Sequence, residues 1–178
     1  MLVDKRTNRN KKLKKMLYLL FGLILLLFIL FLTGRKSVHH EIIIHSDTET
    51  VWNVIINMDE YPNWNPVMEH LEGTLIQGNQ VKYLLTPDEN TAIEVRATVA
   101  QLIAEKILKH TGGNRLVFSF HHVYLIEEIN ETVKVTIHED YRGIAVNFWN
   151  IKPIEKAYER LNYALKERSE HVFSTKAK

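Results

Sequence analysis

The sequence contains no cysteine among its 178 residues. The absence of cysteine excludes disulfides, thiolate metal ligands, cysteine nucleophiles and lipid attachment through cysteine. Glycine-rich phosphate loops, the GxSxG nucleophile motif and the spacing of a Ser/His/Asp triad are also missing. Internal repeats and low-complexity linkers are not found either. The most familiar local signals of catalysis are therefore absent.

Charges of the two signs are divided unevenly along the chain. Residues 1–36 carry nine basic side chains and a single acidic one, Asp4. The remaining residues carry 14 basic and 20 acidic side chains, so the small overall charge of +2 conceals a basic N-terminal part and an acidic remainder. A chain of 178 residues suits one domain with an appendage. The charge division indicates that these are two distinct parts.

An uncharged apolar run, Met16 to Thr33, separates the two parts. As a helix its 18 residues cover roughly 27 Å, close to the hydrocarbon core of a bilayer at about 30 Å. We therefore interpret residues 16–34 as a transmembrane helix. A cleaved signal peptide is the alternative, but its apolar region is usually about 7 to 15 residues long and a small-x-small site follows it. The residues from Phe31 to Lys36 contain no such site, which favours an uncleaved signal anchor.

Basic residues lie unequally on the two sides of this run. Seven precede it, and Arg35 and Lys36 follow it closely. The positive-inside rule therefore predicts a single-pass protein of the cell membrane, with residues 1–15 as a basic cytoplasmic tail and the domain on the extracytoplasmic side. The run from Lys11 to Lys15 also has the composition of a nucleic-acid patch. A topology signal beside a membrane span explains it fully, so we expect no nucleic-acid partner.

The stretch from Ser46 to Pro66 predicts a short helix followed by an aromatic turn. Ser46 and Glu49 have the spacing of a capping box, in which each side chain satisfies an open backbone donor at the helix start. Pro62 and Pro66 prevent the helix from running far beyond Asn57. Apolar residues recur at helical spacing, namely Val51, Trp52, Ile55, Ile56 and Met58. We expect core and turn packing from the three largest aromatic residues here, Trp52, Tyr61 and Trp64.

Period-two patterns before and after this helix predict a succession of antiparallel strands. The expected strands cover residues 38–45, 67–76, 81–85, 93–99, 105–110, 116–126 and 132–141. The expected turns between them lie at 78–79, 87–90, 111–114 and 129–131. A final helix is expected over roughly 145–173, where an apolar stripe opposes a charged one. The succession predicts an α+β domain over residues 37–173.

The opening VWNVIINMDEYPNWNP of this domain, residues 51–66, resembles the START-like, helix-grip superfamily (SRPBCC), especially its polyketide cyclase/dehydrase-type members. FHHVYL at 120–125, TIHEDYRG at 136–143 and LNYALKERSE at 161–170 are similar to later parts of that family's domain. The resemblance implies a seven-stranded antiparallel sheet wrapped around a long C-terminal helix, with an apolar ligand cavity between them. It implies an architecture rather than a task, because one fold hosts many functions.

Nine histidines are the most conspicuous candidates for chemistry. A metal site needs three or four converging ligands, and strand alternation sends His121 and His122 to opposite faces. We therefore expect no metal and no cofactor, and we assign no catalytic residue. If the last two strands turn near Asn130, His122 falls opposite His138 or Glu139. A structural pair, a polar handle at the cavity and an acid/base pair all remain open for His122 and Glu139.

Inward-facing residues of the predicted strands and closing helix supply a candidate ligand cavity. The candidate lining consists of Tyr83, Val95, Phe118, Phe120, His122, Tyr124, Glu139, Trp149 and Tyr158, and Phe148 is a further aromatic candidate. The leading hypothesis is a membrane-anchored domain that binds a hydrophobic small molecule or lipid. The alternatives are a cyclase- or dehydratase-like enzyme acting on an apolar substrate and a protein-docking module of the cell envelope.

Overall fold

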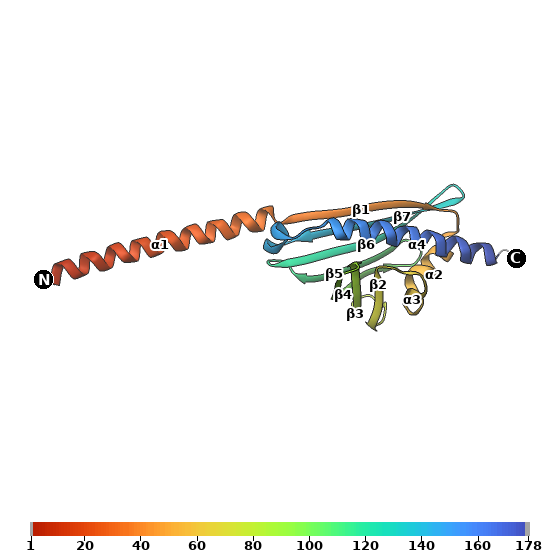
Figure 1. The fold of residues 1–178 in the computed structure, drawn as a ribbon, viewed down its shortest axis with the longest axis horizontal. Coiled ribbons are helices and arrows are strands. Elements are labelled where there is room, and N and C mark those ends of the chain that lie inside the picture. The colour runs from red at the N-terminus through yellow and green to blue at the C-terminus, as the bar shows by residue number, and fades with distance from the viewer. Residues whose placement is uncertain (1, 177–178) are drawn as a thin grey trace.

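Seven antiparallel strands form one curved sheet, and a long C-terminal helix crosses it (Figure 1). The structure, a computed structural model, describes the backbone of residues 2–176 and the side chains of residues 11–176. In chain order the elements are α1 (Leu2–Thr33), β1 (Arg35–Ile44), α2 (Thr48–Ile56), η1 (Met58–Glu60), α3 (Tyr61–Trp64), β2 (Met68–Gly73), β3 (Gln80–Asp88), β4 (Thr91–Ile103), β5 (Ile107–Asn114), β6 (Phe118–Ile129), β7 (Thr132–Arg142), η2 (Ile144–Phe148) and α4 (Lys152–Lys176). The expected sheet, closing helix and α+β class are confirmed.

The strand order β1-β7-β6-β5-β4-β3-β2 places the first strand beside the last and leaves the others as a meander. Because neighbouring strands run in opposite directions, the start of β1, the end of β7 and the β3–β4 and β5–β6 hairpins all lie at one end of the sheet. We call this the α1 end, since α1 leads directly into β1 there (Figure 1). Helix α4 also begins at this end, immediately after β7 and η2.

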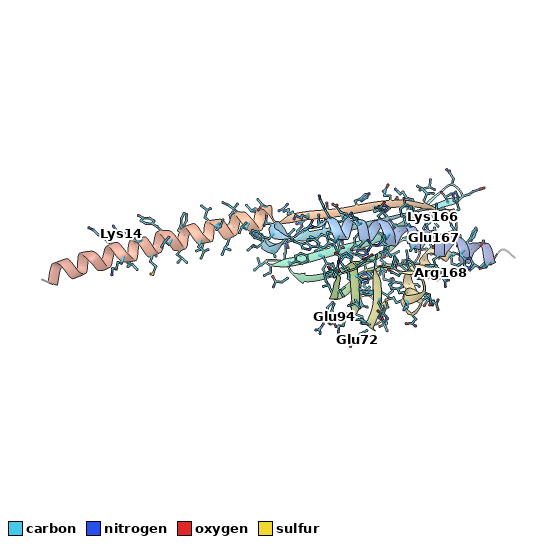
Figure 2. All side chains as sticks on the ribbon, viewed as in Figure 1. Lys14, Glu72, Glu94, Lys166, Glu167 and Arg168 are labelled. Atoms are coloured by element: carbon cyan, nitrogen blue, oxygen red, sulfur yellow. The ribbon has the colours of Figure 1, made fainter. Side chains whose placement is uncertain are left out.

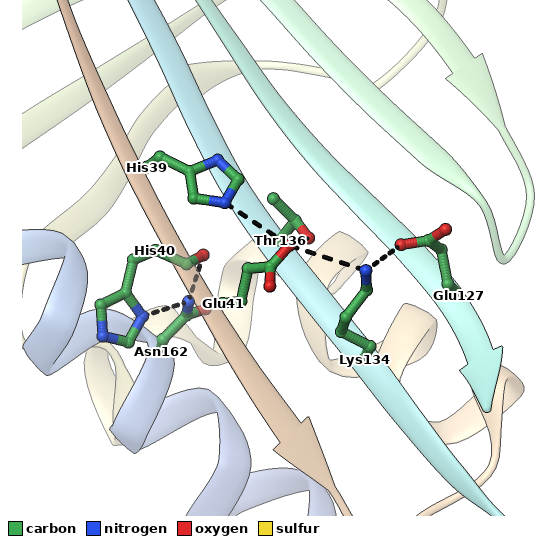
Figure 3. A network of polar contacts seen from close by, with 7 residues as sticks. All are labelled: His39, His40, Glu41, Glu127, Lys134, Thr136 and Asn162. Carbon is green, nitrogen blue, oxygen red and sulfur yellow. Dashed lines mark hydrogen bonds and ion pairs between the residues drawn. The ribbon is translucent and has the colours of Figure 1, made fainter. Parts of the chain in front are cut away.

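Helix α4 buries its apolar stripe against the sheet. Leu161 and Leu165 are completely inaccessible to solvent, and the side chain of Asn162 fixes the helix to β1. Its Nδ2 donates to the backbone oxygen of His40 at 3.1 Å and lies 2.9 Å from His40 Nδ1 (Figure 3). The expected helix start near residue 145 is wrong, because residues 144–148 form a separate 3-10 turn. Pro153 lies in the first turn of α4, where its missing N–H costs no hydrogen bond.

The start of α2 differs from the expected capping box. Asp47, rather than Ser46, is the N-cap, and its carboxylate accepts a hydrogen bond of 2.6 Å from the backbone N–H of Thr50. Ser46 lies one residue too early for that role, and its hydroxyl donates instead to the backbone oxygen of Asp47. Asp and Ser are about equally good N-caps, so only the backbone conformation decides which of two neighbouring residues serves.

The YPNWNP segment forms a packed connection between α2 and β2. The Tyr61 hydroxyl donates to the backbone oxygen of Ile55 at 2.7 Å, which folds the chain back onto α2. The side-chain oxygen of Asn65 accepts from the backbone N–H groups of Val67 and Met68 at 3.0 and 2.8 Å. These bonds give Tyr61 and Asn65 physical roles in the motif that suggested the fold.

One expected turn, at 111–114, lies inside a strand, and the turn expected at 87–90 is confined to residues 89–90. Residues 111–114 continue β5 and pair with residues 118–121 of β6, and the turn follows at 115–117. Pro87 belongs to β3, where the pairing with β4 is interrupted between Leu85 and Asp88, so its missing N–H breaks no regular ladder. The expected two-residue hairpin at 78–79 is the end of a longer connection between β2 and β3. The turn near Asn130 is confirmed, and this residue has a positive φ of 55°.

Helix α1 projects from the domain with its side chains directed outward on every side (Figure 2). Residues Lys11–Thr33 form a helix that is long and apolar enough to cross a membrane, a property that signal sequences near the N-terminus share. None of its residues is fully buried, as Lys14 illustrates (Figure 2), and only Leu30 and Phe31 near its end are half-buried. Most of the hydrophobic surface of α1 is therefore left without a protein partner within the described residues.

Gly143 allows β7, η2 and the β5–β6 hairpin to approach closely, and this supplies a test of the fold. Its φ of 128° and ψ of 166° lie in a region that only glycine occupies readily, and a Cβ would meet the backbone oxygen of Val117 at 2.4 Å. Gly143→Ala is therefore expected to lower the free energy of unfolding by about 2 to 4 kcal/mol. Denaturant titration of the full chain in detergent micelles measures the loss.

Gly78→Ala is the matched control for this substitution. Gly78 also has a positive φ, of 92°, but a Cβ there meets no atom within 4 Å. Its replacement adds backbone strain alone and is expected to cost about 1 kcal/mol. If both variants lose the same free energy of unfolding, the close contact between residue 143 and Val117 relaxes without an energetic penalty.

Candidate functional site

A cavity of about 580 Å³ lies between the concave face of the sheet and the first turns of α4. All nine residues predicted as its lining lie in its wall. Phe148 does not, because its side chain is 76% exposed on η2, so its expected place in the cavity is wrong. Strands β2 to β7, α4 and Tyr61 of α3 all contribute to the wall, which is mostly aromatic and aliphatic.

The cavity reaches solvent on the β4 side. Ile93 of its wall is 42% exposed, and Gly113 at the end of β5 is also exposed. Glu94 belongs to the same rim, with its carboxylate 2.8 Å from the ammonium of Lys82 (Figure 2 labels Glu94). Residues 93–94 lie near the start of β4 and Gly113 lies near the end of β5, so the opening faces the α1 end of the sheet.

A buried polar cluster sits in the wall around Glu139. Glu139 Oε2 accepts a hydrogen bond of 2.7 Å from the hydroxyl of Tyr141 and another from the hydroxyl of Tyr158. His122 stands opposite Glu139 on the neighbouring strand, as one of the two predicted registers required. Its Nδ1 lies 3.5 Å from Glu139 Oε2 and 3.1 Å from the Tyr158 hydroxyl. A carboxyl group, an imidazole and two phenols thus meet inside an otherwise apolar cavity.

One ring nitrogen of His122 has no hydrogen-bond partner among the described residues. This atom is Nε2, and it is buried, as is His122 as a whole at 5% exposure. Because the Tyr158 hydroxyl donates to Glu139, it can only accept from Nδ1. In the neutral imidazole the proton then belongs on Nδ1, and Nε2 is a bare acceptor in the cavity wall. A buried polar atom without a partner is costly, so this nitrogen marks where a ligand group would be stabilised.

A second polar pair lies beside the first. His110 on β5 stands opposite His122 on β6, and its Nε2 is 3.3 Å from the Tyr83 hydroxyl. Burial lowers the pKa of His110 from 6.5 to about 3, and the neighbouring His122 contributes in the same direction. The Tyr83 hydroxyl is also 3.2 Å from the sulfur of Met58. His110 is therefore neutral at physiological pH and serves as a polar wall residue.

The buried phenols of the wall remain protonated at neutral pH. Burial raises the pKa of Tyr83 above its ordinary value. Burial, assisted by the nearby Glu139, also raises the pKa of Tyr141. Both hydroxyls therefore act as hydrogen-bond donors or acceptors and not as phenolate bases.

The wall also contains residues that were not predicted as lining, and three of them, Tyr61, His110 and Tyr141, add polar groups among the buried aromatic side chains. For two of them the sequence contains a usable signal, because His110 lies two residues from the buried Leu108 and Tyr141 two residues from Glu139, so each shares its neighbour's face of a strand. Tyr61 carries no such periodicity, and only the fold brings it to the cavity. The packing role expected of Tyr61 is nevertheless present, since its side chain is 2% exposed.

The remaining histidines lie outside this site. His39 and His138 pair on the outer face of β1 and β7, where His39 Nε2 is 3.4 Å from Glu41 (Figure 3). Lys134 joins the same surface network, 3.6 Å from Glu41 and 2.8 Å from Glu127 (Figure 3). Within the part of the chain that the structure describes, no three His, Asp or Glu side chains are arranged to hold a metal ion.

No protein-family model matches the sequence, and comparison with curated proteins gives no match. Solved structures do share the architecture. A START superfamily protein from Mycobacterium smegmatis is 16% identical with a TM-score of 0.59, over 76% of this chain and 98% of that one. The chain has the START/Bet v1-like helix-grip fold.

Other helix-grip structures match over a similar span. Major latex-like protein 151 from Panax ginseng is 14% identical with a TM-score of 0.61, over 76% of this chain and 97% of that one. Truncated norcoclaurine synthase from Thalictrum flavum is 15% identical with a TM-score of 0.53, over 75% and 92%. Helix-grip domains commonly bind hydrophobic ligands, but identities this low establish the fold alone.

Proposed function

We propose that this helix-grip domain binds a hydrophobic small molecule or lipid in its cavity while α1 anchors it in the cell membrane. The observation that carries the proposal is the cavity itself. Its volume of about 580 Å³ falls within the range of about 300 to 1,000 Å³ that is usual for small-molecule sites. Its wall combines apolar side chains with a few converging polar groups, which is the composition expected of a specific ligand site.

The polar cluster indicates the chemistry of the ligand. The bare Nε2 of His122 calls for a hydrogen-bond donor, and Glu139 with Tyr158 holds the imidazole in that tautomer. The surrounding aromatic residues Phe118, Phe120 and Trp149 suit a hydrocarbon or isoprenoid-like body. The ligand we propose is therefore an apolar molecule with one hydroxyl or similar donor group.

Anchoring by α1 gives such a ligand a source, because the bilayer dissolves it. Only Gly34 separates α1 from β1, so the domain stays beside the membrane that α1 crosses. With seven basic residues before the span and two after it, the N-terminus belongs in the cytoplasm and the domain on the extracytoplasmic side. The acidic domain provides no support for a nucleic-acid partner.

The same cluster favours a second candidate, an acid/base enzyme acting on an apolar substrate. His122, Glu139 and Tyr158 lie within hydrogen-bonding distance of one another in the cavity wall, an arrangement suited to moving a proton. A nucleophile or cofactor site is not evident beside them in the described residues, so binding takes precedence over catalysis. Turnover of the bound molecule by the wild-type chain and its loss in Glu139→Gln would establish the enzyme.

Filling the cavity is expected to weaken ligand binding strongly. Val95 is half-buried in the wall opposite Tyr83, and a tryptophan there occupies ligand space. Val95→Trp is expected to weaken binding about tenfold to a hundredfold, since overpacking of this kind typically costs about 1 to 3 kcal/mol. Native mass spectrometry of the full chain in detergent, after incubation with membrane lipid extract, measures the bound fraction and the ligand mass.

The matched control places the same side chain outside the cavity. Ile76 is 58% exposed in the β2–β3 connection and takes no part in the wall, so Ile76→Trp should retain wild-type uptake. A wild-type chain that stays free of ligand, or a Val95→Trp chain that binds as well as Ile76→Trp, would contradict the binding proposal.

A further inference from the structure

The end of α1 is fastened rigidly to the domain beside the cavity. Asn147 of η2 donates from Nδ2 to the backbone oxygen of Leu30 at 2.7 Å, and its Oδ1 accepts from the Thr33 hydroxyl at 2.9 Å. The Gly143 N–H donates to the oxygen of Gly34 at 2.9 Å, an approach so close that a Cβ on Gly34 would meet the Gly143 oxygen at 2.1 Å. Helix α1 and the domain therefore keep one relative orientation.

Around that junction lies a group of exposed apolar side chains, which we call the apolar tip and define as Leu116, Val117 and Phe148. They are 63%, 57% and 76% exposed. Leu116 and Val117 form the β5–β6 turn, whose backbone oxygens accept from the N–H groups of Ile144 and Ala145 at 3.0 Å each. The turn and η2 are thus one hydrogen-bonded unit, and η2 also holds the end of α1. The apolar tip lies where α1 enters the domain.

Arginines accompany the apolar tip. Arg35, Arg115 and Arg142 are exposed at the α1 end, and none forms an ion pair within the described residues. Arg35 and Arg142 lie directly opposite each other on β1 and β7, where like charges destabilise the sheet. An anionic surface relieves this repulsion. The basic edge contrasts with the net negative charge of the domain as a whole.

We infer that the apolar tip and these arginines form a second membrane contact, which seats the α1 end of the domain on an anionic phospholipid surface. The inference rests on the proposed anchoring by α1. If α1 crosses the bilayer and ends at Thr33, its rigid junction brings the apolar tip to the level of the lipid headgroups. Apolar side chains enter the interface there while the arginines meet phosphate groups.

This seating connects the bilayer with the cavity. Phe118 follows Val117 directly and Trp149 follows Phe148 directly, and both lie in the cavity wall with ring centroids 5.2 Å apart. At two places along the chain, an exposed residue of the apolar tip is therefore followed directly by an aromatic residue of the cavity wall. A lipid-soluble ligand would pass along this apolar path between membrane and cavity and avoid bulk water.

Single-cysteine spin labels test the seating cleanly, because the chain contains no cysteine of its own. The full chain is reconstituted in bilayers containing phosphatidylglycerol, with one label at Leu116→Cys, Phe148→Cys, Ile76→Cys or Leu26→Cys. The relative rates of collision with oxygen and with a water-soluble nickel complex report depth. Labels at 116 and 148 should show a severalfold higher oxygen-to-nickel ratio than the label at 76, which is similarly exposed in the β2–β3 connection.

The label at residue 26 separates the two proposals. If it reports the bilayer interior while 116 and 148 are as aqueous as 76, anchoring stands and the seating is wrong. If the label at 26 is itself aqueous, anchoring fails and the seating fails with it. Arg115→Glu combined with Arg142→Glu should reduce the depth at 116 in anionic bilayers and leave it unchanged in neutral ones. If the label at residue 116 lies equally deep in anionic and neutral bilayers for all variants, the proposed contact between the arginines and lipid phosphates is wrong.

Discussion

Replacing Glu139 by leucine is expected to lower the free energy of unfolding by about 2 to 6 kcal/mol. The carboxylate accepts from the buried hydroxyls of Tyr141 and Tyr158, and both donate to the same oxygen. Leucine fills a similar volume but accepts nothing, so two buried donors lose their partner at a cost of about 1 to 3 kcal/mol each. Denaturant unfolding of the full chain, followed by circular dichroism, measures the change.

Two further variants show whether the missing acceptor is the cause. Glu139→Gln keeps an amide oxygen that serves both phenols and should lose only about 1 kcal/mol. Adding Tyr141→Phe and Tyr158→Phe to Glu139→Leu removes the stranded donors and should recover most of the lost stability, since removal of both partners is nearly neutral. If the leucine and glutamine variants lose equal stability, packing at residue 139 matters and hydrogen bonding does not.

Acidification is expected to destabilise the domain through His110. Its pKa is about 3 in the folded chain and close to 6.5 when unfolded, so the unfolded chain binds the additional proton between these values. The contribution of His110 to stability is complete above pH 6.5 and is lost as the pH falls towards 3. Between pH 7.5 and 4.5 this residue alone should lower the free energy of unfolding by about 3 kcal/mol.

The pH effect is isolated by comparing two substitutions. His110→Gln cannot titrate yet keeps a polar group near the Tyr83 hydroxyl, so its unfolding free energy should depend less steeply on pH over this range. His121→Gln changes an exposed histidine on the opposite face of β6 and should leave the wild-type slope unchanged. Parallel curves for wild type and His110→Gln would show that His110 takes up its proton as readily in the folded chain as in the unfolded chain.

Much of the helix-grip fold and of the cavity wall follows from local patterns in the sequence. Strand alternation decides which side chains face inward, and this suffices to place His122, Tyr124 and Glu139 in one wall. The turn at Asn130 sets the register of the last two strands, and the partner of His122 follows from it. The uncharged run before residue 34 marks α1 by length and composition alone.

Local sequence patterns did not predict where some of the elements begin and end. The choice of Asp47 over Ser46 as N-cap and the start of α4 at Lys152 depend on backbone geometry, which residue type constrains only loosely. Residues 111–114 look like a turn because they are polar and glycine-rich. They form strand because β6 offers their backbone groups a complete ladder of partners.

Long-range contacts decided the rest. Phe148 has the composition of a cavity residue, and only the packing of η2 against the end of α1 turns it to the surface. The meeting of His110 with Tyr83 and the tie between Gly34 and Gly143 join segments far apart in the chain. A sequence determines which face of an element is apolar, because that depends on neighbours along the chain. The tertiary structure determines which faces meet, because that depends on the packing of all the elements at once.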